Sequence, residues 1–360
     1  MGPLLFCLTI HPLLVTLQSD IVFGYLDDVT LGGEAQVVAD DVASIIDRGG
    51  ALGLLLNPSK CEVIVTSPPP ALPAPLDTFV KAIDAGDSIL LGAPIRRGPS
   101  LDKAWVYRCA DLSRASSLLQ DINAQEGLTL LRAAFGAPKV LQLLRCSPSV
   151  DITGPASFFD SLLRSALSGV TNCAFKDVSW IQASLPIKLG GLSLRRAESL
   201  ALPAYLSSST STASLQDAIL GAHAGLLDPH LDAYRTRWSN SFGPIPQAEA
   251  ASKQASWNLP MVEAEKDLVW ASCTSAREKA SFLAACAPHS GDWLKALPIA
   301  ACGMRLDDKA FRLGVALRLG LQVCEPHECP CGSLVDACGS HDFVCKRPQA
   351  GLHGTAPSTT

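Results

Sequence analysis

Two aspartates stand side by side in the segment GYLDDVTLGG, residues 24–33. Apolar residues flank them, so the pattern predicts a strand over Ile21–Leu26, a return strand over Val29–Leu31, and an end of the hairpin at two glycines. Adjacent carboxylates repel each other, and a divalent cation offsets that repulsion. Asp27 and Asp28 are therefore candidate Mg²⁺ ligands, and the alternative is a solvated turn without a ligand.

Five cysteines and two histidines lie within the 22 residues from Cys324 to Cys345. Cys329 and Cys331 form a C-x-C pair, and His341 and Cys345 form an H-x3-C pair. These four nitrogen and sulfur ligands predict a tetrahedral structural Zn²⁺ site, and the alternative is a degenerate group of free thiols. The remaining candidates, as substitute or supporting ligands, are Cys324, His327, Cys338 and His353.

The composition limits the class of protein. The chain has 360 residues, 48% of them hydrophobic and 18% charged, which is typical of a globular protein and excludes a disordered or fibrous one. The net charge of −5 argues against a coat for nucleic acid. The charge is uneven, however: residues 1–95 hold 3 Lys and Arg against 11 Asp and Glu, and residues 96–200 hold 13 against 8. A polyanion would therefore bind the middle of the chain.

Thirteen irregularly spaced cysteines favour a reducing compartment over a disulfide framework, so we expect an intracellular protein, nuclear or cytoplasmic and not secreted. The apolar stretch from Met1 to Leu17 lacks the Lys or Arg of a signal peptide and is short for a membrane span. We expect it to be a buried helix, and we expect no membrane partner.

Hydrophobic periodicity and turn-forming residues divide the rest of the chain into helices, strands and linkers. Val38, Val42, Ile45 and Ile46 predict a helix that ends at two glycines, and the turn NPSK predicts a strand pair between residues 54–56 and 61–65. The stretch SPPPALPAP, residues 67–75, predicts a linker, and SSSTSTAS, residues 207–214, predicts a separator between helical blocks. Between them, helices are expected over residues 101–121, 128–145 and 155–167.

Four segments in order resemble motifs of reverse transcriptases. Tyr25, Leu26, Asp27 and Asp28 match the signature Tyr-x-Asp-Asp of the catalytic hairpin. Residues 2–14 resemble the end of the preceding polymerase motif, GLLLNPSKCEVI with Lys60 resembles the following one, and LLGAPI around Leu91 and Gly92 resembles the hairpin that holds the primer end. Together these 95 residues resemble the palm of a non-long-terminal-repeat retrotransposon reverse transcriptase.

The resemblance implies an α+β fold. It places a partial palm, a small antiparallel sheet with helices, at residues 1–95, a mostly α-helical thumb-like region at 96–206, a helical linker region at 207–320, and a Cys/His knuckle at 321–353. It implies an RNA-directed DNA polymerase that uses two Mg²⁺ ions, dNTP, an RNA template and a DNA primer. Asp27 is then the main Mg²⁺ ligand and Asp28 a weaker one.

Two further residues take roles from the resemblance. Tyr25 would lie against the primer backbone, and Lys60 would supply charge or a proton to the departing pyrophosphate. Simple packing of Tyr25 and an exposed turn position for Lys60 are the alternatives. The family's first catalytic aspartate and its fingers have no counterpart in the sequence, so we expect this polypeptide to be inactive by itself.

The basic middle of the chain supplies candidate phosphate contacts. In the thumb-like region these are Arg96, Arg97, Arg132, Lys139, Arg195 and Arg196, with Arg108, Arg145 and Lys188 as further candidates. Residues 185–208 resemble a segment found downstream of the palm in such elements, with Gly190 and Gly191 at a turn. Scattered surface charges on amphipathic helices are the alternative.

Two other functions remain open at this point. The first is a non-catalytic module, derived from a retroelement, that binds nucleic acid or protein through the basic residues and the knuckle. The second is a helical protein of the host with chance motif matches. The sequence leaves the oligomeric state and the template RNA undefined, and it contains no nucleotide-binding P-loop or serine-hydrolase motif.

Overall fold

The computed structural model describes residues 2–65, 71–78, 81–221, 230–339, 341, 344 and 345. The described part is α+β and mostly helical, with four sheets of two strands each. It divides into two compact units, each assembled from three segments. One comprises Met1–Ala104, Gln142–Asp151 and Ala201–Trp257, and the other comprises Trp105–Leu141, Ile152–Leu200 and Asn258–Thr360. In the described residues, no helix has the length and apolarity needed to span a bilayer.

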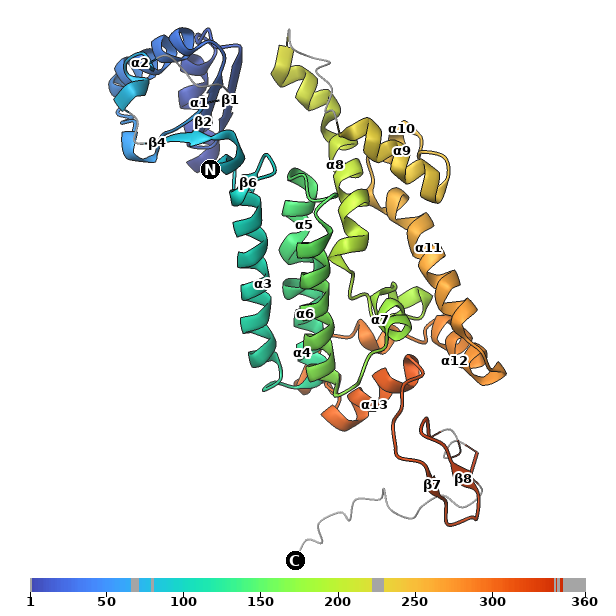
Figure 1. Cartoon of the computed structure of the whole chain (residues 1–360). Helices are drawn as coiled ribbons and strands as arrows, with labels where there is room; N and C mark the ends of the chain where they lie inside the picture. Colours follow the sequence, from blue (N-terminus) through green and yellow to red (C-terminus); the bar gives the residue numbers. More distant parts are fainter. Residues whose placement is uncertain are drawn as a thin grey trace, which may run out of the picture. The chain divides into compact units, whose positions relative to one another are not determined.

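The predicted hairpin around the two aspartates is confirmed. Strands β1 (Ile21–Tyr25) and β2 (Asp28–Gly32) pair antiparallel, and their register sets Ile21 opposite Gly32 and Tyr25 opposite Asp28 (Figure 1). Helices α1 (Gly2–Leu14) and α2 (Ala35–Ala51) belong to the same unit. A Cβ on Gly24 would lie 2.8 Å from Leu14 Cδ1, so glycine permits α1 to approach β1 closely.

The expectation of a buried first helix is wrong for most of its residues. Only Ile10 and Leu13 of α1 are buried, whereas Leu4, Leu5 and Leu8 are each about 60% exposed. The helix is apolar around its whole circumference, but only one side of it contacts β1 and α2. Helix α2 also continues through Gly49 and Gly50, and Leu52 caps it with bonds to both glycine carbonyls.

The second predicted strand pair does not form, although the strand expected over residues 61–65 is confirmed. Residues 54–56 form no strand, and Leu55 is 91% exposed. The NPSK turn is a 3-10 turn over Pro58–Lys60, in which the Asn57 side chain accepts a hydrogen bond from the Ser59 N–H. Strand β3 (Glu62–Val65) pairs in parallel with β4 (Lys81–Asp84), so its partner lies after the predicted linker. The linker residues 66–70 lie outside the described residues.

The hairpin expected from LLGAPI is confirmed. Strands β5 (Ile89–Leu90) and β6 (Ala93–Pro94) pair antiparallel around Leu91 and Gly92. Both turn residues have positive φ, 48° and 79°, as a tight two-residue hairpin turn requires.

The helices of the second unit pack mainly against one another. Helices α4 (Ala124–Leu130), α6 (Thr153–Thr171) and α13 (Asp308–Arg318) are in mutual contact (Figure 1). The unit also holds most of α3 (Pro99–Leu119), together with α7 (Asp177–Ser184) and α12 (Ala276–Cys286). The helix expected over 128–145 is interrupted, because a π-helical turn at Leu131–Phe135 and Gly136 separate α4 from α5 (Ala137–Cys146).

The serine- and threonine-rich stretch at residues 207–214 is helical, so the expected separator is wrong. It lies within α8 (Ala197–Leu220), which is continuous. Thr210 and Thr212 donate from their hydroxyls to the carbonyls four residues earlier, at 2.8 and 2.9 Å, which satisfies these side chains inside a helix. The low-complexity composition therefore marks a partly buried stretch of helix and not a break in the chain.

The remaining helices are α9 (Leu231–Phe242), α10 (Ala248–Ala251) and α11 (Gln254–Ser272). In the first unit, α9 and the start of α11 bury two tryptophans against each other. The rings of Trp238 and Trp257 meet edge to face at 4.9 Å, and the Trp257 indole N–H donates to the Ala251 carbonyl at 2.7 Å. Val150, Leu206 and Tyr234 complete this core.

Candidate metal centre

The structure brings the four predicted zinc ligands together. The ligand atoms of Cys329, Cys331, His341 and Cys345 all lie within 4.8 Å of one another. The Cys331 Sγ lies 3.1 Å from His341 Nε2, and the Cys329 Sγ lies 3.6 Å from the Cys345 Sγ. Three thiols and one imidazole around a common centre form a donor set that Zn²⁺ prefers in closed, four-coordinate structural sites.

A short hairpin positions the first two ligands. Strands β7 (His327–Glu328) and β8 (Leu334–Val335) pair antiparallel, and Cys329 and Cys331 lie in the connection between them. The Cys329 N–H donates to the Ser333 carbonyl at 2.9 Å, and the Gly332 N–H donates to the Cys329 carbonyl at 2.7 Å. Gly332 has φ of 86°, a conformation that glycine adopts without strain.

The same turn favours the metal-binding form of one thiol. Hydrogen bonds from the Ser333 hydroxyl and backbone N–H lower the pKa of Cys331 to about 6. The thiolate is the species that binds a metal ion, so Cys331 is already a competent ligand near neutral pH.

The alternative ligands lie elsewhere. The Cys324 thiol donates to the Asp336 carbonyl at 3.3 Å, and His327 Nδ1 lies 2.8 Å from the Glu325 carbonyl. Neither these residues nor Cys338 belongs to the cluster that the described residues form. His353 lies outside the described residues.

The aspartate pair forms a different kind of site. Asp27 lies in the two-residue turn, Asp28 begins β2, and both side chains are exposed. Asp28 lies directly across the ladder from Tyr25, which is 53% exposed. In the part of the chain that is described, no third acidic, histidine or cysteine side chain joins Asp27 and Asp28 in a cluster. Lys60 is exposed in its 3-10 turn.

A buried carboxylate, that of Asp41, binds the segment that leads into β1. Asp41, on α2, is 5% exposed and accepts hydrogen bonds from the Gln18 N–H, the Ser19 N–H and the Ser19 hydroxyl. Although burial opposes it, this set of bonds lowers the pKa of Asp41. The segment that leads into β1 is thereby tied to α2, a contact that the sequence pattern did not reveal.

Most of the predicted phosphate contacts are engaged within the chain. Arg97 pairs with Asp151, Lys139 pairs with Asp111, and Arg196 pairs with Glu265. The Arg132 guanidinium donates to the Leu294 carbonyl at 2.8 Å. Burial lowers the pKa values of Arg132 and Arg195. Arg96, by contrast, is exposed and has no ion pair with another described residue.

The three further candidates differ among themselves. Arg145 donates to the Gln254 side chain at 2.7 Å, and Arg108 lies over the ring of Tyr107. Lys188 lies in the 3-10 turn Ile187–Leu189, which ends at Gly190. The φ of 87° at Gly190 confirms the predicted turn.

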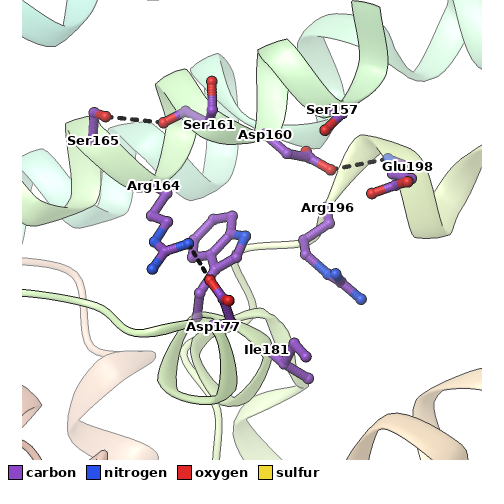
Figure 2. Close-up of a pocket in the computed structure, with 10 residues that line it drawn as sticks. Ser157, Asp160, Ser161, Arg164, Ser165, Asp177, Ile181, Arg196 and Glu198 are labelled. Atoms are coloured by element: carbon purple, nitrogen blue, oxygen red, sulfur yellow. Dashed lines mark hydrogen bonds and ion pairs between the residues drawn. The ribbon is translucent and has the colours of Figure 1, made fainter. Parts of the chain in front are cut away.

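A polar pocket in the second unit was not predicted from the sequence. It has a volume of about 380 Å³ and lies between α6, α7 and the start of α8 (Figure 2). Arg164 pairs with Asp177 at 2.8 Å, and the buried Asp160 accepts hydrogen bonds from the backbone of Ala197 and Glu198. The pocket side chains therefore bond to one another and to backbone, which is typical of a structural role.

The sequence matches no protein-family model and none of the curated proteins. The function is therefore inferred from the geometry of the Cys/His cluster and of the hairpin that holds Asp27 and Asp28.

Proposed function

We propose that this chain is part of the reverse transcriptase polypeptide of a non-long-terminal-repeat retroelement, in which a structural zinc ion organises the Cys/His segment. The single observation that carries the proposal is the β1–β2 hairpin, which presents Asp27 and Asp28 to solvent at its tip. An exposed carboxylate pair can reach a hydrated cation and the phosphates of a nucleotide from solvent.

Each residue of the hairpin has a distinct role in this proposal. Mg²⁺, when bound, activates a hydroxyl nucleophile and stabilises charge on the phosphates. Asp27 and Asp28 would hold it, and Tyr25, opposite Asp28, would contact the primer backbone. Leu91 and Gly92, at the tip of the β5–β6 hairpin, would support the primer end. Template, primer and dNTP are the partners under this proposal.

A second candidate function has one observation in its favour. Among the described residues, Asp27 and Asp28 lack the third ligand that a two-metal centre needs. This observation supports a non-catalytic module that binds nucleic acid or protein and is derived from such an element.

Cation binding at the hairpin tests the proposal. Terbium(III) takes the place of Mg²⁺ at carboxylate sites and luminesces when a nearby tyrosine is excited. We expect terbium affinity to fall about tenfold or more in the double variant D27N/D28N, since about 1.4 kcal/mol corresponds to a factor of ten. Y25F should lower the luminescence, and D47N, at an exposed aspartate of α2, should leave it unchanged. Luminescence that is indifferent to D27N/D28N would contradict the proposal.

Primer extension tests whether this chain is active by itself, and a positive result would exclude the second candidate function. The full chain is incubated with a DNA primer on an RNA template, dNTPs, and Mg²⁺ or Mn²⁺. We expect no extension by this chain alone, because two carboxylates do not hold two ions. If the parent chain extends the primer and D27A does not, another group must supply the third metal ligand. That result would exclude the non-catalytic module.

A further inference from the structure

The β7–β8 hairpin has an outward face that no described residue covers. Its register sets His327 opposite Val335 and Glu328 opposite Leu334. Residues opposite each other in a ladder share one face, and successive residues alternate between faces. Val335 is fully buried although His327 opposite it is exposed, whereas Leu334, at 76%, and Glu328 are both exposed. Leu334 and Glu328 therefore lie together on the outer face.

A second apolar side chain is exposed close to the metal ligands. Val344 is 74% exposed, and its N–H donates to the His341 carbonyl at 3.0 Å in the turn that leads to Cys345. Leu334 and Val344 are thus two large apolar side chains that are exposed on this segment.

The negative charge of residues 321–345 indicates which kind of molecule would bind to this face. Residues 321–345 contain four acidic residues and no Lys or Arg. Glu325 and Glu328 are exposed, and Asp336 pairs with Arg277. With Zn²⁺ bound, the three thiolates of the cluster would add a further negative charge. Lys346 and Arg347, outside the described residues, follow in the sequence but do not outnumber the acids.

We propose that the outer face of the β7–β8 hairpin is a protein-docking surface, and that its occupant is a Lys- or Arg-rich polypeptide segment with interspersed apolar residues. The apolar residues of the partner contact Leu334, and its cations lie beside Glu325 and Glu328. A nucleic acid is disfavoured there, because its phosphates would meet the carboxylates of Glu325 and Glu328. The inference rests on the zinc site of the proposed function, which folds the hairpin.

The test uses a labelled 12-residue peptide of alternating lysine and leucine, titrated into the zinc-loaded full chain by fluorescence anisotropy. We expect binding that weakens with salt and falls about tenfold, or about 1.4 kcal/mol, in E325Q/E328Q. E263Q, at an exposed glutamate of α11, is the matched control and should bind like the parent chain. Equal binding by E325Q/E328Q and the parent would overturn the proposal.

Two further probes define the surface. A lysine–serine peptide of the same length measures the apolar contribution: L334S should weaken the lysine–leucine peptide and leave the lysine–serine peptide unchanged. Single-stranded RNA and duplex DNA are titrated in parallel. Loss of RNA or DNA affinity in E325Q/E328Q or L334S would identify a nucleic-acid surface and overturn the proposal.

Zinc analysis of the same samples separates this inference from the proposed function. A chain without zinc that fails to bind the peptide contradicts the zinc site itself. A chain with one zinc ion that fails to bind it contradicts only the docking surface.

Discussion

The carboxylate of Asp160, on α6, accepts a hydrogen bond from the Ala197 N–H at the start of α8, at 2.6 Å. A second bond comes from the Glu198 N–H at 3.1 Å, so a side chain from another helix satisfies two of the free N–H groups of α8 (Figure 2). Asp160 is 5% exposed, and burial raises its pKa to about 6, although both backbone bonds oppose that shift. The helix-to-helix contact thus depends on pH.

The sign of that dependence follows from linkage. The folded chain binds the Asp160 proton more tightly than the unfolded chain does, so the free energy of unfolding falls as pH rises from about 4 to about 6. We expect a loss of at most about 3 kcal/mol across this window. D160N should not show it, and D121N, at an exposed aspartate, should show the parent's profile. Urea unfolding at several pH values measures the difference, and a parent chain that gains stability relative to D160N over this range would contradict it.

Substitution of one cluster cysteine should empty the metal site. We expect one zinc ion per reduced chain, and far less than one in C345S, because three ligands without the fourth leave the site open. The control is C146S, at an exposed cysteine outside the cluster. Elemental analysis after dialysis provides the measurement, and Co²⁺ absorption reports thiolate coordination. Full zinc content in C345S would exclude this ligand set.

Arg96 and Arg196 should behave differently towards a primer–template duplex. Arg96 is exposed, so R96A should weaken binding and reduce the slope of log affinity against log salt by about one. Arg196 pairs with the mostly buried Glu265, so R196A should cost about 1–3 kcal/mol of unfolding free energy and leave the salt slope unchanged. Anisotropy at several salt concentrations and urea unfolding separate the two effects. Affinity that is indifferent to salt in the parent chain would contradict duplex binding.

Trp257 should be a large contributor to stability in the first unit. Its side chain is fully buried against Trp238, so W257A should lower the free energy of unfolding by about 3–5 kcal/mol. Trp270 is 38% exposed, and W270A should cost less. Thermal or urea unfolding followed by circular dichroism measures both variants. A loss of equal size in the two would mean that the Trp238–Trp257 contact is not a principal source of stability.

Local sequence signals predicted the local elements well. The hairpin at 21–32 follows from strand residues around a short turn, and the four clustered ligands follow from their spacing within 17 residues. The hairpin at 89–94 was expected only from the resemblance of LLGAPI to a reverse transcriptase motif. The parallel pairing of β3 with β4 has no turn signal, so it could not be predicted.

Contacts between residues that are distant in the sequence could not be predicted either, because no local signal marks them. Asp160 and Ala197 are 37 residues apart, and Arg196 and Glu265 are 69 residues apart. A basic residue looks the same in the sequence whether it faces phosphate or a carboxylate of its own chain. The excess of positive charge at residues 96–200 was therefore real, but most of the predicted contacts serve the packing of helices.

The sheets of the described residues have two strands each, so no described strand has neighbours on both sides. About half of the peptide N–H groups of such a strand point away from its partner and meet solvent or another molecule. Deuterium should enter these strands quickly and enter the core of α6 slowly. The strands next to Asp27, Asp28, Cys329 and Cys331 should therefore exchange quickly, and slower exchange on adding a cation or a peptide would report which of them has bound a ligand.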